Sequence, residues 1–258
     1  MKVIHADGPV EIHKCPSDYG LFNRVLAMLQ LLAEHSGDEM LNVECTPSMH
    51  CPGVLSEVFA ELPGVKLHDT TQQVKQDTGY KLPLEIRQHT QWKHLVKHLQ
   101  VSDHITQRVY QLHDSCNSQY VAVHVRRTDM DDKRLAEESV IATDQNFVDW
   151  IDQQIDHNPG VRLYIATDNQ VTHDKFKKLY HTRVLNPQYH DKLKLSSTRA
   201  TRWKDSDKHK KRHTTLTDAV LDWCMCVGAA EFRGTSYSTF TAVAQAARNM
   251  KTSEKPGE

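Results

Sequence analysis

Strand-like and helix-like segments alternate along most of this chain, and that alternation most restricts its fold. Short apolar runs rich in β-branched residues are separated by longer stretches with apolar residues at helical spacing. A first series of strands is expected at 10–15, 40–46 and 65–69, with helices at 21–35, 53–64 and 91–113. A second series of strands is expected at 120–125, 161–166, 182–185 and 230–234, with helices near 146–156, 172–180, 215–228 and 239–250. This pattern predicts parallel sheets covered by helices.

The two series predict a two-domain α/β protein. A chain of 258 residues is long enough to bury two cores of ordinary size. We therefore expect two Rossmann-like halves, residues 1–115 and residues 116–258, which face each other across a cleft. In open parallel sheets, ligands bind beyond the carboxyl ends of the strands. The loops that follow the strands of the second half are therefore the first places to look for functional residues.

The overall charge is not that of a protein that binds nucleic acid or a membrane surface. The formal net charge is −1, so no whole-protein field attracts polyanions. The 6 cysteines include no CxxC pair, and we expect reduced thiols and no metal site. No apolar run approaches the ~20 residues of a membrane-spanning helix, and residues 1–20 do not resemble a signal peptide. We expect a cytoplasmic protein.

The first loop of interest follows the apolar strand "VAVHV" and begins with Arg126 and Arg127. A strand that ends in guanidinium groups can direct them at an anion, and arginine suits bidentate recognition of phosphate. The alternative is ordinary surface pairing with Asp129, Asp131 or Asp132, since surface ion pairs are common and weak. On the arginine pair alone, both interpretations stay open.

A second loop, "GTSYSTF", lies between an expected strand and the helix at 239–250. The backbone N–H groups and the dipole at the start of that helix can bind an anion. Ser238 and Thr239 can add hydroxyl donors. These hydroxyls also suit simple N-capping of the helix, and both roles can hold at once. A helix N-terminus on one side and arginine on the other predict a site that binds a diphosphate between them.

Asp222 lies in the helix expected at 215–228, where Val220, Trp223 and Val227 supply the apolar side. A carboxylate on such a helix can accept two N–H groups from the Watson–Crick edge of guanine. The alternative is a solvated carboxylate on the outer face, because charged residues on helices are mostly exposed.

Three motifs, taken in order and with their spacing, resemble the α1,6-fucosyltransferase family. They are "HVRRTD" at 124–129, "YIATDN" at 164–169 and "DAVLDWCMCVGAAEFRGTSYSTF" at 218–240. The resemblance covers most of residues 118–250. It implies a GT-B-type fold and an inverting, metal-independent transfer of fucose from GDP-fucose to a glycan hydroxyl. Residues 1–115 would then form the acceptor-side domain and residues 116–258 the domain that binds the nucleotide sugar.

The resemblance also implies roles for individual residues of this chain. Arg126 would hold the β-phosphate and stabilise the charge on departing GDP, and Arg127 would support the same site. Asp222 would read guanine, His124 would contact the nucleotide near the guanine, and Asp168 would lie beside the nucleotide. The hydroxyl-bearing residues of the second loop that are expected to bind the donor are Thr235, Ser236, Ser238 and Thr239.

Two departures from the family pattern affect the expected site. The family has a glycine-richer turn before its first long helix, and this chain has Gly20 and Asn23 there as the corresponding donor-binding positions. The family also has an acid soon after "HVRRTD", and that register falls on Arg134. The expected general base is therefore one of the nearby carboxylates, Asp131, Asp132, Glu137 or Glu138.

Other functions stay open at this point. The expected partners are a nucleotide-sugar donor and a glycan acceptor, with no cofactor beyond the donor substrate. A related enzyme can use another nucleotide sugar such as a UDP-sugar, and the arginine at position 134 also suits a non-catalytic module that binds a sugar nucleotide or a glycan. The basic run at 202–213 suits a protein that binds RNA or polyphosphate.

Overall fold

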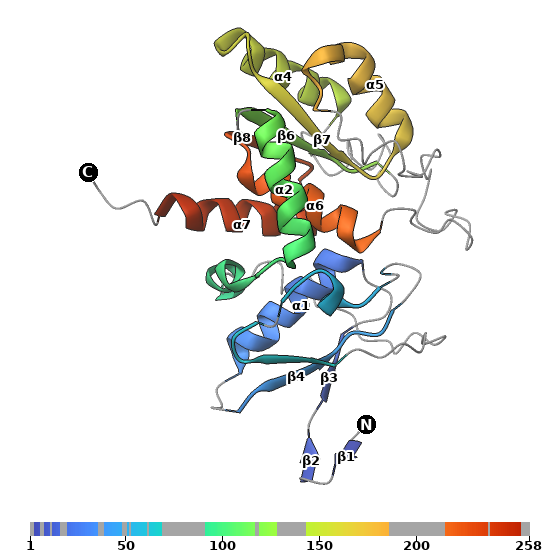
Figure 1. Ribbon diagram of the computed structural model, residues 1–258, viewed down its shortest axis with the longest axis vertical. Coiled ribbons are helices and arrows are strands. Elements are labelled where there is room, and N and C mark those ends of the chain that lie inside the picture. Colours follow the sequence, from blue (N-terminus) through green and yellow to red (C-terminus); the bar gives the residue numbers. More distant parts are fainter. Residues whose placement is uncertain are drawn as a thin grey trace. The chain divides into compact units, whose positions relative to one another are not determined.

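The structure is a computed structural model of the chain (Figure 1). It describes residues 3–5, 8–10, 12–15, 20–35, 39–47, 51, 53–60, 62–68, 91–116, 119–127, 143–185, 215–236 and 238–253. Contacts divide the chain into two compact units. Unit 1 comprises Met1–Ile105, Thr215–Val220 and Gln245–Glu258, and unit 2 comprises Thr106–Thr214 and Leu221–Ala244. The division between residues 115 and 116 stays a prediction.

Unit 1 contains a three-stranded parallel sheet. The strands β3 (Ile12–Lys14), β4 (Leu41–Glu44) and β5 (Val65–His68) pair in that order, and β1 (Val3–His5) and β2 (Gly8–Val10) form a separate antiparallel pair. The helix α1 (Leu21–Glu34) connects β3 to β4. It buries an apolar stripe at helical spacing: Leu21, Val25, Met28 and Leu29. The predicted strands and first helix of this series are thus confirmed.

The two helices expected at 53–64 and 91–113 are wrong in their extent. Among the described residues of 53–64 only Leu55–Glu57 are helical, as the short 3₁₀ helix η1, and 91–113 is divided into the 3₁₀ helix η3 (Gln91–His98) and α2 (Asp103–Ser115). The cause is a pairing between the two segments, in which Phe59 and Val101 form an antiparallel bridge. Backbone that hydrogen-bonds across such a bridge is not available for the helical ladder, so tertiary pairing overrides the helical spacing.

Unit 2 contains the second parallel sheet, with β6 (Tyr120–Val125) at its centre. The neighbours of β6 are β7 (Arg162–Thr167) and β8 (Glu231–Gly234). After the 3₁₀ helix η4 (His181–Arg183), Val184 adds a parallel bridge at Leu163, on the outer side of β7. The helices that follow β6 are α4 (Asp144–His157), α5 (Gln170–Tyr180), α6 (Leu216–Gly228) and α7 (Thr239–Ser253); the first turn of α6 and the second half of α7 belong to unit 1. These elements confirm the second predicted series except at 182–185, where the expected strand is wrong: His181–Arg183 form a 3₁₀ helix, and Val184 makes only an isolated bridge.

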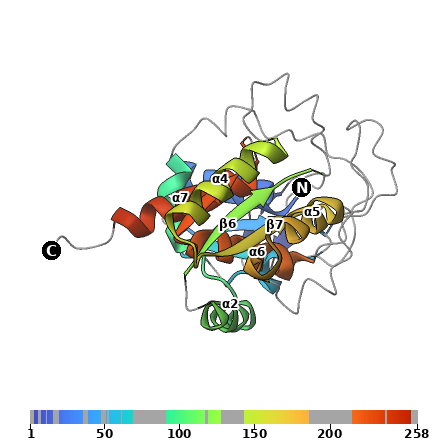
Figure 2. The same ribbon diagram turned by 90° about the horizontal axis from the view of Figure 1, so that it is seen from above.

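Both faces of this sheet are covered by helices. Alternate residues of β6 and β7, such as Val123 and Ile165, pack in one cluster with Phe147 of α4 and Phe176 of α5. Tyr164 lies on the other face and bonds to α6. In Figure 1, α4 and α5 lie above β6 and β7, and α6 and α7 lie below them; Figure 2 shows β6 and β7 side by side between α4 and α6. All six residues of β6 are buried, as expected for a parallel strand with two covered faces.

The order of the strands singles out one end of the sheet. From β6 the chain first goes to β7 on one side, and the later connection through α6 crosses back to β8 on the other side. The order therefore reverses between β6 and β8. Open parallel sheets bind their ligands at the carboxyl ends of the strands beside such a reversal. None of the described helices has the length and apolar character needed to cross a membrane.

Candidate anion-binding site

The carboxyl ends of β6 and β8 are joined through Thr235, which follows β8. The buried Thr235 hydroxyl donates to the carbonyl oxygen of His124 at 3.0 Å and accepts the backbone N–H of Arg126 at 3.0 Å. The Thr235 N–H donates to the same His124 carbonyl at 2.8 Å. One side chain therefore fixes the backbone on both sides of Val125, immediately before the Arg126 side chain leaves the sheet.

The start of α7 lies against this edge because β8 ends in a glycine. A Cβ built on Gly234 would lie 2.4 Å from the Cγ2 and Oγ1 atoms of Thr241, in the first turn of α7. Only a residue without a side chain permits that approach. Thr241 Oγ1 in turn shares a 2.9 Å hydrogen bond with Nδ1 of His124, and the His124 ring stacks on Phe240 at 4.1 Å between centroids. The sequence therefore places the N-terminus of α7 beside the end of β6.

Ser238 lies immediately before α7 and has the position of an N-cap residue. Its carbonyl accepts the N–H of Ala242 at 3.0 Å, and its own N–H donates to the Thr235 carbonyl. Its side chain is only 3% exposed, and within the described part of the chain its Oγ has no hydrogen-bond partner. A buried hydroxyl without a partner costs free energy. A ligand oxygen at the helix N-terminus would remove that cost.

Arg127 is bound within the protein. Its guanidinium is fully buried, and its Nε and Nη2 donate to Oδ1 of Asp144 at 2.9 and 2.8 Å. Its Nη1 donates to the carbonyl of Arg126 at 2.8 Å, and its charge lies 5.8 Å from the ring centroid of Phe147. Arg127 is therefore ion-paired inside the protein and not in the surface pairing considered for it. Its partner is an acid at the start of α4, whereas the acids considered earlier, at positions 129, 131 and 132, lie outside the described residues.

The Asp144 carboxylate binds two cationic side chains from different elements. Lys175 of α5 donates to its Oδ2 at 2.8 Å, while Arg127 holds Oδ1. Burial alone would raise the pKa of the Asp144 carboxyl, but the hydrogen bond from Lys175 and the charge of Arg127 outweigh burial and lower this pKa. The carboxylate is therefore charged at neutral pH. Asp168, which follows β7, accepts the N–H of Arg127 at 2.9 Å.

Asp222 lies on the inner side of α6, where it is only 8% exposed. Its Oδ1 accepts a 2.7 Å hydrogen bond from the hydroxyl of Tyr164 in β7. Burial, followed by the charge of Asp222, raises the pKa of the Tyr164 hydroxyl, so this group stays a neutral donor. The alternative of a solvated carboxylate on the outer face of the helix is therefore excluded for Asp222.

The structure brings most of the predicted donor-binding residues to one edge of unit 2. Those at or beside the carboxyl ends of its strands are His124, Arg126, Arg127, Asp168, Thr235, Ser236, Ser238 and Thr239. Ser236 is exposed, Arg126 and Asp168 are partly buried, and Thr239 is 5% exposed. The contacts between these residues agree with a single site, although their individual roles stay predictions.

Other predicted residues lie elsewhere. Gly20 and Asn23 belong to unit 1, where the Gly20 carbonyl accepts the Asn23 N–H at the start of α1. The predicted catalytic carboxylates, together with position 134, lie outside the described residues: Asp131, Asp132, Glu137 and Glu138. Among the residues that the structure does describe, no three His, Cys, Asp or Glu side chains are placed to hold a metal ion.

Sequence reasoning missed Asp144 and Tyr164, the partners of two predicted site residues. Thr143 and Asn146 form a reciprocal capping box at the start of α4, and the "TDQN" segment carries that signal. The signal marks a helix start at Asp144 but not its pairing with Arg127. Tyr164 stands in the second motif, where only its strand position was used.

Solved structures of the α1,6-fucosyltransferase NodZ have the same fold as this chain. One, co-crystallized with GDP, has 12% sequence identity and a TM-score of 0.58, and the match covers 91% of this chain and 90% of that chain. A second, soaked with GDP-fucose, has 11% identity and a TM-score of 0.54, with 92% and 91% covered. NodZ from Bradyrhizobium has 13% identity and a TM-score of 0.55, with 91% of each chain covered.

The comparisons show the fold of this chain and not its activity. No protein-family model matches the sequence, and no curated protein sequence matches it. At identities this low, likeness is evidence of fold, since one fold carries many functions. The chain has the α/β fold with parallel sheets that it shares with the NodZ structures, which confirms the α/β class predicted from the alternating segments.

Proposed function

We propose that this protein is a glycosyltransferase that transfers fucose from GDP-fucose to a glycan hydroxyl, with inversion and without a metal. The observation that carries the proposal is the buried Ser238 hydroxyl, which has no protein partner in the described part of the chain and lies at the start of α7. This start lies beside the end of β6, where the strand order reverses. The NodZ structures with the same fold were obtained with GDP and with GDP-fucose, which supports the same donor here.

The proposed diphosphate site uses α7 and the end of β6. The first N–H groups of α7 and the hydroxyl of Ser238 donate to phosphate oxygens, and the helix dipole favours their negative charge. Thr239 lies in the same turn, and Ser236 is exposed in the loop. Arg126 adds a positive charge from the neighbouring strand. These groups neutralise the diphosphate from two sides.

The same groups account for the proposed chemistry. Cleavage of the glycosidic bond leaves a negative charge on GDP and a positive charge on the sugar carbon. Fixed donors at the β-phosphate stabilise the departing GDP more than they stabilise the intact donor, which lowers the barrier. A base removes the proton of the acceptor hydroxyl as it attacks from the opposite face. The proposed candidates for this base are Asp131, Asp132, Glu137 and Glu138.

Selection of guanine is assigned to Asp222, and His124 and Asp168 are proposed to lie along the nucleotide. Asp222 is buried in the protein, where its Oδ1 accepts from Tyr164, and a carboxylate is the acceptor that suits the paired N–H donors of guanine. Uracil and adenine do not present the same pair of donors. In the proposed GT-B-type arrangement, residues 116–258 hold the donor and residues 1–115 lie on the acceptor side.

The proposal is tested by thermal unfolding with GDP, UDP and ADP. We expect GDP to raise the Tm of the wild-type protein by about 4 °C at saturating concentration, and UDP and ADP to raise it less. Arg126→Ala should lose most of this gain. Arg162→Ala is the matched control, since Arg162 begins β7 at the opposite end of the sheet. A larger shift with UDP than with GDP, or an unchanged GDP shift in Arg126→Ala, would contradict the proposal.

A second candidate function, a non-catalytic module that binds a sugar nucleotide, is favoured by one feature of the sequence. The family has an acid where this chain has Arg134. GDP-fucose incubated with the protein and a panel of glycans distinguishes the two. Release of GDP that depends on the glycan supports the transferase, and tight binding of GDP-fucose without any release supports the module.

A further inference from the structure

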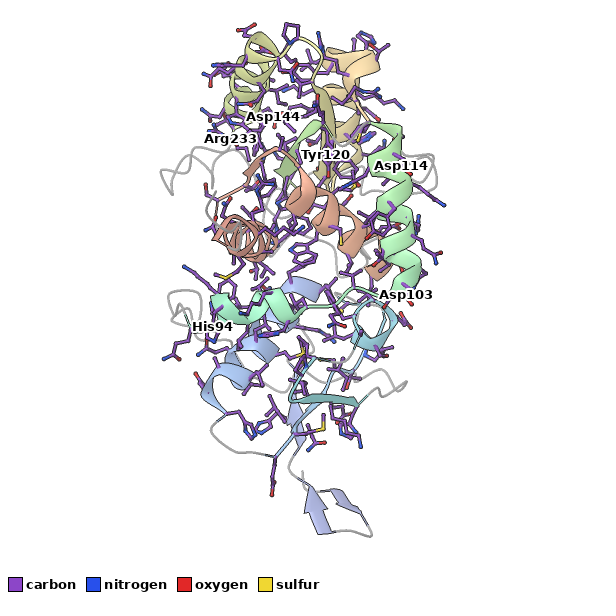
Figure 3. All side chains as sticks on the ribbon, turned by 60° about the vertical axis from the view of Figure 1, so that its left-hand side comes forward. His94, Asp103, Asp114, Tyr120, Asp144 and Arg233 are labelled. Atoms are coloured by element: carbon purple, nitrogen blue, oxygen red, sulfur yellow. The ribbon has the colours of Figure 1, made fainter. Side chains whose placement is uncertain are left out.

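We propose that Asp144 is a positioning residue for the diphosphate site, which acts through Arg127 to hold the backbone from which Arg126 reaches the phosphates. This inference rests on the proposed function, in which Arg126 contacts the diphosphate. Asp144 was not among the predicted site residues. It is the first residue of α4 (Figure 3), and it contacts Arg127 rather than any proposed ligand.

The backbone of Arg126 and the N–H of Arg127 are all hydrogen-bonded within the protein. The N–H of Arg126 donates to Thr235 Oγ1 at 3.0 Å, and the N–H of Arg127 donates to Asp168 Oδ1 at 2.9 Å. The carbonyl of Arg126 accepts from Nη1 of Arg127 at 2.8 Å. Side chains that follow β8 and β7, together with the side chain of Arg127 itself, therefore fix this short piece of backbone. A charged side chain that leaves a fixed backbone loses less conformational freedom when it binds a ligand.

The Arg127 guanidinium can bond to the Arg126 carbonyl in this position only because Asp144 binds the opposite edge of the guanidinium. Its Nε and Nη2 both donate to Asp144 Oδ1, at 2.9 and 2.8 Å, and its side chain has no exposed surface. A buried guanidinium that loses its carboxylate is an uncompensated charge. It would turn toward water or toward a bound phosphate, and the bond to the Arg126 carbonyl would be lost with that movement.

Lys175 adds a second contact to the same carboxylate. It donates to Asp144 Oδ2 at 2.8 Å and is 45% exposed. Lys175 therefore links α5 to the Asp144–Arg127 ion pair while its own side chain stays partly in solvent. With both oxygens bonded, the carboxylate is held in one orientation. We infer that the Arg127 charge is neutralised within the protein, and that its contribution to phosphate binding is made through the position of Arg126.

The test compares GDP with guanosine, which lacks both phosphates, in Asp144→Asn. Asp149→Asn is the matched control, because it removes the same charge from an exposed position on the same helix. NMR titration of the folded proteins gives both dissociation constants. We expect Asp144→Asn to weaken GDP binding about tenfold while guanosine binding changes less than about twofold. Asp149→Asn should leave both within about twofold of the wild type.

A second variant keeps the test informative if Asp144→Asn does not fold. In Arg127→Met with Asp144→Leu, both charges are removed together, a replacement that is often neutral for folding. GDP binding should fall about tenfold in this variant as well. Wild-type GDP affinity in either folded variant, or an equal loss of guanosine binding, overturns the positioning role alone. Failure of the wild-type protein to bind GDP overturns the proposed function and this inference together.

Discussion

Thr235 and Arg126 are joined by a hydrogen bond of 3.0 Å between a side-chain hydroxyl and a backbone N–H. The same hydroxyl donates to the carbonyl of His124 at 3.0 Å. The side chain of Thr235, in the loop after β8, thus fixes the backbone at the end of β6, from which the Arg126 side chain projects. This contact connects the two loops that the sequence analysis identified separately.

Thr235→Val tests this connection with little change in side-chain volume. Valine can neither accept from Arg126 nor donate to His124, and the loss of these two buried bonds should reduce the free energy of unfolding by about 2 kcal/mol. GDP binding should weaken as well, because the backbone at Arg126 is less fixed. Urea denaturation and calorimetry give the two quantities. Thr235→Ser keeps the hydroxyl and should retain most of the stability and most of the GDP affinity. If Thr235→Val and Thr235→Ser lose equal amounts of stability and affinity, the role assigned to the Thr235 hydroxyl is contradicted.

Gly234→Ala tests the close approach of α7 to β8. The added Cβ would lie 2.4 Å from two atoms of Thr241, so the helix start or the strand end has to move. We expect a loss of about 2–3 kcal/mol in the free energy of unfolding, as for other overpacked sites. Gly160→Ala is the control, because its nearest atom would be 3.5 Å away. Equal stability losses in both variants would show that the predicted clash at Thr241 is absent.

Asp144→Asn should give a stability loss that depends on pH. The pKa of this carboxyl is lowered in the folded protein from its ordinary value of 3.8, so its ion pairs contribute stability above that value and lose it as the pH falls through the lowered pKa. Near pH 7 the variant should be less stable by about 2–3 kcal/mol. The difference from the wild type should shrink as the pH falls from about 5 toward about 3. A difference that stays constant over this range would exclude the charge as its cause.

His181→Gly should stabilise the protein. His181 ends α5 with φ 37° and ψ −111°, a conformation that glycine adopts far more easily than histidine. Such strain costs about 1–3 kcal/mol, and the greater entropy of unfolded glycine offsets about 1 kcal/mol of it. Thermal unfolding should give a small increase in Tm. His35→Gly, at the end of α1 with φ −72°, relieves no strain and should lower Tm.

The alternating elements of unit 2 could be predicted because local and long-range preferences agree there. Every residue of β6 is buried between two layers of helices, so its run of apolar residues appears directly in the sequence. In unit 1 the preferences conflict. Residues 53–64 have helical spacing, but Phe59 pairs with Val101, and such a pairing between segments 42 positions apart (101 − 59) leaves no mark in either segment.

The site could be located from sequence, but the partners of its residues could not. Arg127 was expected beside a ligand or a surface acid, and its partner is Asp144, 17 positions further on at the start of a helix. Asp222 carries a helical apolar pattern around it, yet only the packed sheet reveals its bond to Tyr164, 58 positions away. Pairings of this kind depend on how helices pack on a sheet, which spacing along the chain does not encode.

The most direct test of the central claim is a crystal structure of the protein with GDP. We predict that oxygens of the diphosphate lie about 3 Å from Ser238 Oγ and from the first N–H groups of α7, with the Arg126 guanidinium on the side opposite α7. GDP bound away from the start of α7, with the Ser238 hydroxyl bonded to another protein group, would contradict it.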